Sequence, residues 1–239
     1  MFVFGQKFIG FRRMCNLYSQ TKSQDAMRHV FDDVLAAGEE LVDQSGNLPP
    51  LTNIWPDYSA PIIRRGGVDT WQLTMARWGM PTPAKFLEGK RTDKGVTNIR
   101  NISSPHWRRW LGTESRCLVP FTSFSELDQR RGAPRNHPVW FSLGQDRPLA
   151  FFAGLHTEWT SVRTIKEGEV SAELFGFLTC IPNAEVQPVH PKAMPVILTT
   201  PAEWRQWLTA PTDEALRLQR PLQDGLLEIV TEGGREDAG

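Results

Sequence analysis

The feature of this chain that most constrains its fold is a succession of short strand-like segments between residues 116 and 200. No helical segment separates one from the next before about residue 201. Strands that do not alternate with helices argue against a βαβ arrangement. They predict an α+β single domain with a strand-rich, barrel-like core and a few flanking helices. The segments are RCLVPFTSF, PVWFSL, LAFFAGL, LFGFLTC and PVILTT.

Three segments carry helix signals. Apolar residues recur at helical spacing over 20–37, and Gly38 is expected to close that helix. Ser104 and the proline after it predict the start of a short helix over HWRRWL. Thr200 and Glu203 form a capping box that opens the helix EWRQWL.

The rest of the chain predicts further strands and loops. Residues 47–61 are Pro-rich and predict a loop, followed by the strand-like PIIRR and a turn at Gly66 and Gly67. Residues 70–79 alternate as a strand does. The polar stretch 81–97, rich in Pro, Gly and Lys, predicts a surface loop.

Composition narrows the functional class. Twenty-seven basic residues balance twenty-seven acidic ones, so a generic basic nucleic-acid coat is excluded and any polyanion site must be a local patch. No apolar run reaches the roughly 18–20 residues that span a bilayer, so no membrane partner is expected. Three cysteines without metal-ligand spacing suggest neither a zinc site nor a disulfide framework. We expect a cytoplasmic protein with no metal or organic cofactor.

The chain is expected to divide into an N-terminal extension over 1–13, one domain over 14–211, and a C-terminal segment over 212–239 whose last eight residues fray. Residues 1–13 lack the features of a secretory signal. We therefore expect translation to start at Met14. The alternative is that residues 1–13 form a genuine short strand or arm.

Four short, chemically mixed segments stand beside predicted strands, and they contain Cys15, Asn98, Glu126 and His190. Each has an ordinary structural reading. A single Cys is usually a small apolar residue, a Glu after a strand is usually solvated, and Asn or His beside prolines can serve a turn. From the residues alone, the chain is a strand-rich enzyme or binding module.

Taken together and in this order, the segments resemble the SOS response-associated peptidase (SRAP) family, from Met14 to about Pro211. The resemblance implies a sensor of abasic sites in single-stranded DNA, active in the SOS response and associated with the nucleoid. It implies a covalent DNA–protein crosslink through Cys15 after removal of Met14, with autoproteolytic or lyase-like activity. The motifs that carry it are Met14-Cys15, Trp78-Gly79, Asn98-x-Arg100, RCLVP leading to Glu126, FAGL, and VHPKAMPVIL.

The chemistry suits an N-terminal cysteine. A ring-opened abasic site is an aldehyde, to which an adjacent amine and thiol can both add to close a thiazolidine. An α-amine has a pKa of about 7.7–8.0, against about 10.4 for Lys, so far more of it is neutral and nucleophilic at pH 7. The thiol then reacts intramolecularly. An internal cysteine cannot close this ring.

The resemblance also implies roles for individual residues. Asn98 would orient the amine or the opened sugar, Glu126 would shuttle protons, and His190 would act as a general acid in ring opening. The expected DNA contacts come from Arg100, Thr179 and Trp78. Trp107 and Trp110 are further candidates for base stacking. Seven arginines against three acids between Arg100 and Arg135 predict a local basic patch.

The chain departs from the family pattern at several positions. Asn16 and Leu17 replace the usual Gly-Arg after the cysteine, Ile102 replaces a glutamate, and Leu127 replaces an aromatic residue. Pro191 stands where an acid is typical. These changes affect the expected DNA contacts more than the four-residue core. The chain is therefore expected to be a divergent branch.

Two other functions remain open at this point: a peptidase or amidase that uses an N-terminal Cys nucleophile, and a non-catalytic single-stranded DNA binder if residues 1–13 are retained. The expected partner is single-stranded DNA containing abasic sites, and we expect a monomer. The sequence does not determine crosslink reversibility or the preferred DNA structure.

Overall fold

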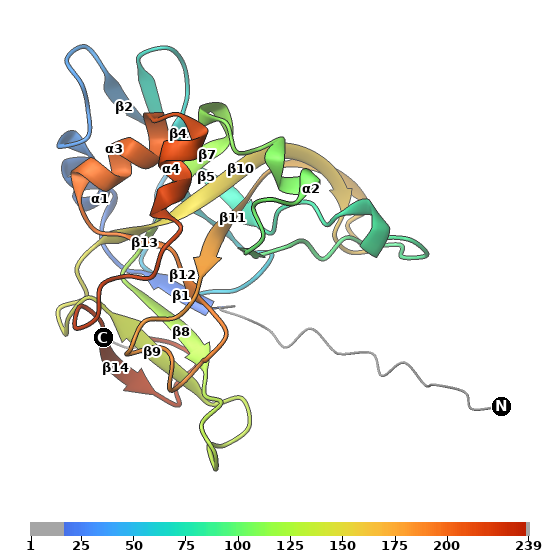
Figure 1. The fold of residues 1–239 in the computed structure, drawn as a ribbon. Helices are drawn as coiled ribbons and strands as arrows, with labels where there is room; N and C mark the ends of the chain where they lie inside the picture. Colours follow the sequence, from blue (N-terminus) through green and yellow to red (C-terminus); the bar gives the residue numbers. More distant parts are fainter. Residues whose placement is uncertain (1–16, 238–239) are drawn as a thin grey trace.

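The computed structural model describes residues 17–237 and has a closed five-stranded barrel at its centre (Figure 1). The strands are β4 (Ser59–Arg65), β5 (Thr70–Trp78), β7 (Arg116–Phe121), β10 (Ala150–Val162) and β11 (Glu169–Cys180). They pair in the order β11-β10-β7-β4-β5, and β5 pairs back to β11 in parallel, which closes the circle. The predicted α+β, barrel-like class is confirmed.

Aromatic side chains fill the barrel. The rings of Phe121 and Phe152 stack with centroids 3.9 Å apart, and Phe152 contacts Phe177 at 4.6 Å. Trp78 stacks on Phe177 at 5.2 Å. These residues come from four different barrel strands, β5, β7, β10 and β11, and their side chains meet in one shared core. All four are fully buried.

A second sheet joins the barrel. It contains β14 (Glu228–Glu232), β9 (Pro138–Ser142), β8 (Ser123–Leu127), β1 (Leu17–Gln20) and β3 (Leu51–Ile54), in that order. Only Thr122 separates β7 from β8, so the chain passes directly from the barrel into this sheet. Tyr18 of β1 packs edge-on against Trp78 and Phe152. This contact ties the two sheets together.

The helices are short and lie on two sides of the barrel (Figure 1). The helix expected over 20–37 is shorter, because α1 (Gln24–Asp32) begins after the Ser23 cap and ends before Gly38. The capping box at Thr200 is confirmed and opens α3 (Pro201–Thr209). The others are α2 (Pro105–Arg108), α4 (Thr212–Ala215) and the 3₁₀ turns η1 (Ala84–Phe86), η2 (Thr113–Ser115) and η3 (Leu216–Leu218). In Figure 1, α1, α3 and α4 lie on one side of the barrel whereas α2 lies on the other.

Four very short or edge strands complete the sheets: β2 (Glu40–Asp43), β6 (Asn98–Ile99), β12 (Met194–Pro195) and β13 (Ile197–Leu198). The expected strand PVILTT is divided, since β12 pairs with β11 whereas β13 pairs with β10. The expected loop over 47–61 is also wrong in part, because it contains β3 and the start of β4.

The C-terminal segment belongs to the fold through residue 237, so the expected fraying of 232–237 is wrong. Asp237 is 1% exposed and accepts two hydrogen bonds of 2.8 Å from the guanidinium of Arg147. Ser123 of β8 donates to the same carboxylate. Buried polar groups of this kind hold a chain end in place.

Candidate functional site

Glu126 lies in the second sheet, close to the start of the described chain. It belongs to β8 and is 2% exposed. The neighbouring strand β1 is antiparallel to β8, with Leu17 opposite Ser125. The first described residue of the chain is therefore one position from Glu126 along the sheet. The carboxyl group of Glu126 is removed from bulk water.

His190 faces Glu126 from a separate loop. Its Nδ1 atom lies 3.5 Å from Oε2 of Glu126 and 2.9 Å from the carbonyl oxygen of Ala193. The backbone N–H of Gln129, just beyond β8, donates to the carbonyl of Val189 at 2.9 Å. This bond ties the His190 loop to the end of β8.

Burial sets the protonation state of His190. The side chain is 1% exposed, and burial lowers the pKa of the imidazole, although the hydrogen bond to Ala193 opposes this. Because the Ala193 carbonyl can only accept, Nδ1 carries the proton. Nε2 is then the ring atom that takes up and releases a proton.

Asn98 lies at the edge of the barrel. It begins β6, which pairs in parallel with β11 so that Asn98 is opposite Phe177. The side chain is 8% exposed, and its Nδ2 donates to Oγ1 of Thr97 at 2.9 Å. The carbonyl of Thr97 accepts in turn from Nε1 of Trp78 at 3.2 Å. The barrel core thus fixes the position of Asn98.

Strand β1 relates these two parts of the site. The backbone of Tyr18 is opposite Phe124 of β8. The centroid of its ring lies 6.1 Å from that of Phe177, the residue that pairs with Asn98 between β11 and β6. The start of β1 is therefore bordered by the sheet that carries Glu126 and by the barrel strand beside Asn98. Cys15, the expected nucleophile, lies outside the described residues.

Two expected DNA contacts lie near the same edge. Thr179 of β11 is 1% exposed, and its Oγ1 has no hydrogen-bond partner within residues 17–237. Arg100 is exposed, and its Nη1 lies 3.4 Å from the carbonyl oxygen of Lys192. Lys192 follows His190 by two residues. Arg100 therefore lies over the loop that carries the histidine.

Trp78 does not offer a face for stacking, which corrects the expectation that it contacts DNA. It is fully buried between Tyr18 and Phe177, where it supports Asn98 through Thr97. Trp107 and Trp110 are 6% and 5% exposed and are also core residues. Burying a large aromatic ring removes a large apolar area from water, which favours a core position for these tryptophans.

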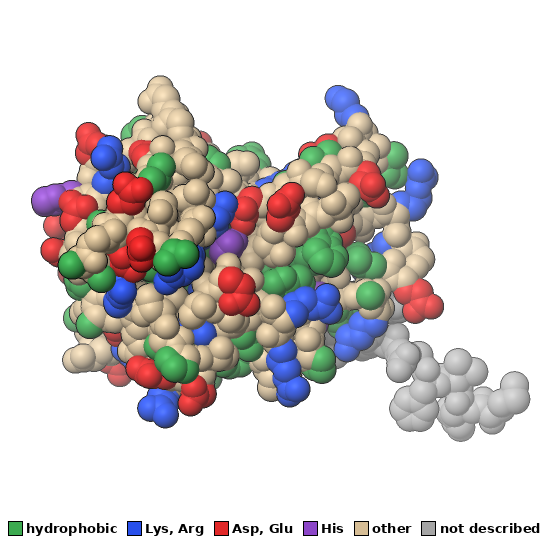
Figure 2. Space-filling model, turned by 90° about the horizontal axis from the view of Figure 1, so that it is seen from above, with side chains coloured by type: hydrophobic (Ala, Val, Ile, Leu, Met, Phe, Trp, Pro, Cys, Tyr) green, Lys and Arg blue, Asp and Glu red, His purple; other side chains and the backbone are tan. Residues whose placement is uncertain are grey.

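The arginine-rich stretch does not form one continuous basic surface. Arg116 is 1% exposed and donates to the carbonyls of Leu111, Trp207 and Ala210. Arg130 pairs with acidic side chains. Acidic and basic side chains are interspersed over the face seen in Figure 2. Local sequence counts therefore overestimate the charge available to a polyanion.

Three residues to which the sequence analysis assigned no role contact the candidate site residues: Thr97, Lys192 and Gln219. Thr97 accepts from Asn98, and Lys192 contributes the carbonyl beside Arg100. Lys192 could have been found from the sequence, because it is a basic residue two positions after His190. Gln219 had no signal, because its partners are backbone carbonyls distant in sequence.

The other cysteines are inert thiols. Burial raises the pKa of Cys117 well above its usual value and that of Cys180 to about 12. A thiol that stays protonated at neutral pH is a poor nucleophile. In the part of the chain that the structure describes, no cluster of His, Cys, Asp and Glu could hold a metal ion. No helix of residues 17–237 is long and apolar enough to cross a membrane.

Comparisons with known proteins follow this geometry. A sequence model of one family, described as SOS response associated peptidase (SRAP), matches residues 14–231. The match continues past Pro211, where the domain was expected to end, through most of β14. No curated protein matches the chain significantly.

Solved structures of similar fold come from two bacteria. A protein from Bordetella bronchiseptica has a TM-score of 0.64 and 23% identity, covering 90% of this chain and 97% of its own. One from Bacteroides thetaiotaomicron has a TM-score of 0.63 and 19% identity, covering 90% of each chain. A phage-related protein from Bordetella bronchiseptica has a TM-score of 0.62 and 21% identity, covering 90% and 92%. These likenesses support the fold.

Proposed function

Because the chain belongs to the SOS response associated peptidase (SRAP) family, we propose that it captures abasic sites in single-stranded DNA as a covalent adduct of Cys15. The observation that supports this most is the buried contact between Glu126 and His190 beside the first residue of β1. Two groups that are able to transfer protons therefore lie beside Leu17, two residues after the cysteine in the sequence.

The length of the connection limits where Cys15 can lie. Consecutive Cα atoms are about 3.8 Å apart, so the Cα of Cys15 is within about 7.6 Å of that of Leu17 in any conformation. Leu17 is paired with Ser125, the neighbour of Glu126. The Glu126 and His190 pair therefore belongs to the part of the sheet beside Leu17, which follows Cys15 by two residues in the sequence.

The reaction proceeds in two balanced steps. The neutral α-amine of Cys15 adds to the aldehyde carbon, and loss of one water leaves an imine. The thiol then adds to the imine carbon, and its proton passes to nitrogen as the five-membered ring closes. Glu126 would carry protons in these steps, and His190 would protonate the ring oxygen of the sugar as it opens after Nε2 takes up a proton. Asn98 would orient the amine or the opened sugar.

Hydrolysis at the same place is the second candidate. Removal of residues 1–14 requires cleavage of the peptide bond before Cys15, and the family name refers to a peptidase. Proton transfer by Glu126 and His190 would serve that cleavage as well. Turnover of a foreign peptide without DNA would favour a general peptidase over a self-processing DNA-capturing protein.

The test uses protein prepared with Cys15 as its first residue and an oligonucleotide containing one abasic site. We expect an adduct that survives denaturing electrophoresis, with a mass equal to the sum of the two components less one water. Cys15→Ala is expected to abolish it, and Cys15→Ser, which lacks the thiol, should stop at a labile imine.

Cys117→Ser is the matched control, since its buried thiol is expected to play no part. The chain beginning at Met1 should form the adduct only after it loses its first fourteen residues. Binding of single-stranded DNA without any adduct from the processed chain would instead identify a non-catalytic binder.

A further inference from the structure

Gln219 joins Thr179 of β11 to Arg100, which follows β6. Its Nε2 donates to the carbonyl oxygen of Arg100 at 2.9 Å and to that of Thr179 at 3.0 Å. A side-chain amide has two N–H donors, so this one group connects both backbones at once.

The position of Gln219 is itself well defined. It follows η3, and its backbone N–H donates to the carbonyl of Leu216 at 3.1 Å. Leu218 before it is 6% exposed and packs in the core. The amide is thus carried by an anchored turn.

Arg100 depends on this connection more than Thr179 does. Thr179 is paired with Pro195 within the sheet, whereas Arg100 lies just beyond β6 and is exposed. The contact of its guanidinium with Lys192 is long, at 3.4 Å. Without Gln219, the backbone of Arg100 loses its bond to the C-terminal segment.

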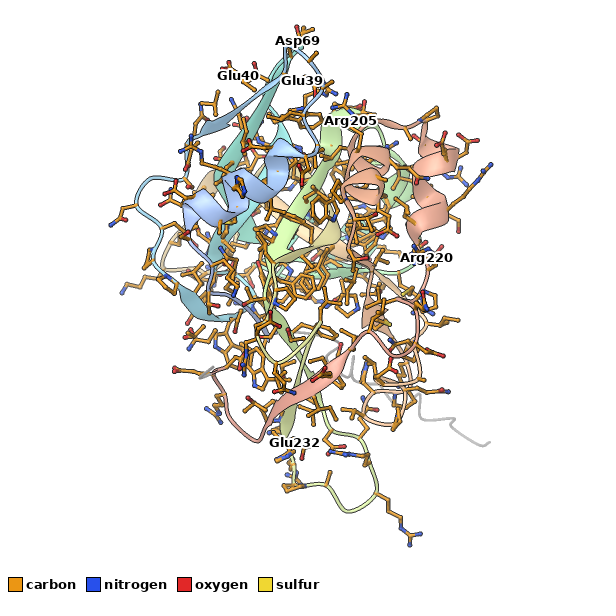
Figure 3. The ribbon with its side chains drawn as sticks, turned by 90° about the vertical axis from the view of Figure 1, so that its left-hand side faces the viewer. Glu39, Glu40, Asp69, Arg205, Arg220 and Glu232 are labelled. Carbon is orange, nitrogen blue, oxygen red and sulfur yellow. The ribbon has the colours of Figure 1, made fainter. Side chains whose placement is uncertain are left out.

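Charges near this point are consistent with an anion site. Through Gln219, the backbone of Arg100 lies beside Thr179 at the end of β11, and Arg220 follows Gln219 in the chain. Both arginines lower the pKa of the neighbouring Cys180 thiol against the larger effect of burial. Arg220 is held by an ion pair with Glu203 of α3. In Figure 3 it lies below the C-terminal helices, on the side away from α1.

We propose that Gln219 is a positioning residue that holds the backbone of Arg100 against that of Thr179, so that the exposed guanidinium of Arg100 contacts a phosphate of the DNA strand. This inference rests on the proposed function. It makes the C-terminal segment after α4 part of the DNA site. Gln219 does not touch the reacting atoms.

The experiment replaces Gln219 with Met, which keeps the length of the side chain and removes both donors. Gln219→Glu is a second variant that also lacks the donors. Gln206→Met is the matched control, because that half-buried glutamine likewise donates from Nε2 to a backbone carbonyl, that of Glu214. Each protein carries Cys15 as its first residue, and its melting temperature is recorded.

Three readouts separate positioning from folding. For Gln219→Met we expect the affinity for intact single-stranded DNA to fall about five- to tenfold. The slope of log affinity against log salt should decrease by about 0.7, the value of one phosphate contact on a single strand. The rate of reaction with propanal, an aldehyde without phosphates, should stay within twofold of wild type, because the Cys15 region is unchanged.

Wild-type affinity and salt slope in both Gln219 variants would overturn the inference. Equal losses with propanal and with abasic DNA would also overturn it, since the residue would then act on the reacting groups or on folding. If wild-type protein forms no adduct at all, the proposed function fails, while the binding measurements still decide the role of Gln219.

Discussion

The imidazole of His190 and the carboxylate of Glu126 approach within 3.5 Å although only 1% and 2% of their side chains are exposed. Nδ1 of His190 donates to the carbonyl of Ala193 at 2.9 Å, so the histidine is fixed in one tautomer. A fixed imidazole beside a buried carboxyl group is the arrangement that the proposed proton transfer needs, and it is not a solvated surface contact. Neither residue is thus a solvated side chain at a strand end or a turn, and their catalytic roles remain predictions.

Acidification is expected to destabilise the fold through His190. Burial lowers the pKa of His190 in the folded state below the value of about 6.5 in the unfolded chain. The unfolded chain then binds more protons in the window below 6.5, so the free energy of unfolding falls as the pH falls through it and is unaffected above it. Urea denaturation at pH 7.5 and 5.5 measures this loss.

His190→Gln should lose less stability than wild type between these two pH values. His29→Gln, at a side chain that is 90% exposed, should behave as wild type does. An unchanged pH dependence in His190→Gln would show that other groups cause the loss.

Gly95 is expected to tolerate no side chain. Its φ is +75°, and a Cβ there would lie 2.2 Å from Nη1 of Arg163 and 2.9 Å from the Cα of Gly79. Arg163 is 2% exposed and donates to the carbonyls of Gly79 and Asp93, so it cannot move freely. Gly95→Ala should cost about 2–4 kcal/mol.

Gly89→Ala is the control, because its φ is +71° and no atom lies within 4 Å of the added carbon. It should cost about 1 kcal/mol from backbone strain alone. Equal losses in urea denaturation would show that crowding at Arg163 does not matter. Because Gly95 precedes Asn98 by three residues, Gly95→Ala should also slow adduct formation.

The C-terminal contact of Asp237 should contribute measurably to stability. Burial raises the pKa of Asp237, but hydrogen bonds from Arg147 and Ser123 outweigh it and lower the pKa below the usual value. The stability it contributes is thus present above about pH 3.9 and is lost as the pH falls through the lower folded-state pKa. Asp237→Asn at pH 7 should cost about 2–3 kcal/mol.

Glu236→Gln serves as the control for Asp237. Glu236 is exposed, and within residues 17–237 its side chain accepts one hydrogen bond, from Asn53. The substitution should change the melting temperature little. Similar effects of both substitutions would mean that the chain end is not held by the buried carboxylate.

Local signals in the sequence predicted the parts of the fold that are stabilised locally. The capping box of Thr200 and Glu203 and the alternation of residues 70–79 each involve neighbours in the chain, and both were correct. The strands β6 and β12 are two residues long, which is too short for any periodic pattern. Their existence depends on pairing with β11, a contact between distant segments.

The site was predictable as a set of residues but not as a geometry. The order of motifs indicated Glu126 and His190, which the fold brings together, and Asn98 at the neighbouring barrel edge. The burial of Trp78 and the role of Gln219 were not predictable, because both depend on which strands lie next to one another. Trp78 is buried by residues of other strands, and the amide of Gln219 donates to backbone carbonyls that are distant from it in the sequence.

Thr179→Val should separate stability from DNA binding. The buried Thr179 hydroxyl has no hydrogen-bond partner within residues 17–237, so it carries a desolvation cost without a compensating bond. Valine has nearly the same shape, and its introduction should leave the free energy of unfolding unchanged or raise it by up to about 1 kcal/mol. If the hydroxyl donates to a DNA phosphate, the same change should weaken binding of single-stranded DNA about fivefold, measured by fluorescence anisotropy.

Thr122→Val provides the contrast, because that buried hydroxyl is bonded to the carbonyl of Ser19. This substitution should lower stability by about 1 kcal/mol and leave DNA binding unaffected. A loss of stability in Thr179→Val as large as in Thr122→Val would mean that the Thr179 hydroxyl is already satisfied in the free protein. If Thr179→Val folds stably and binds DNA as wild type does, the Thr179 hydroxyl does not contact DNA.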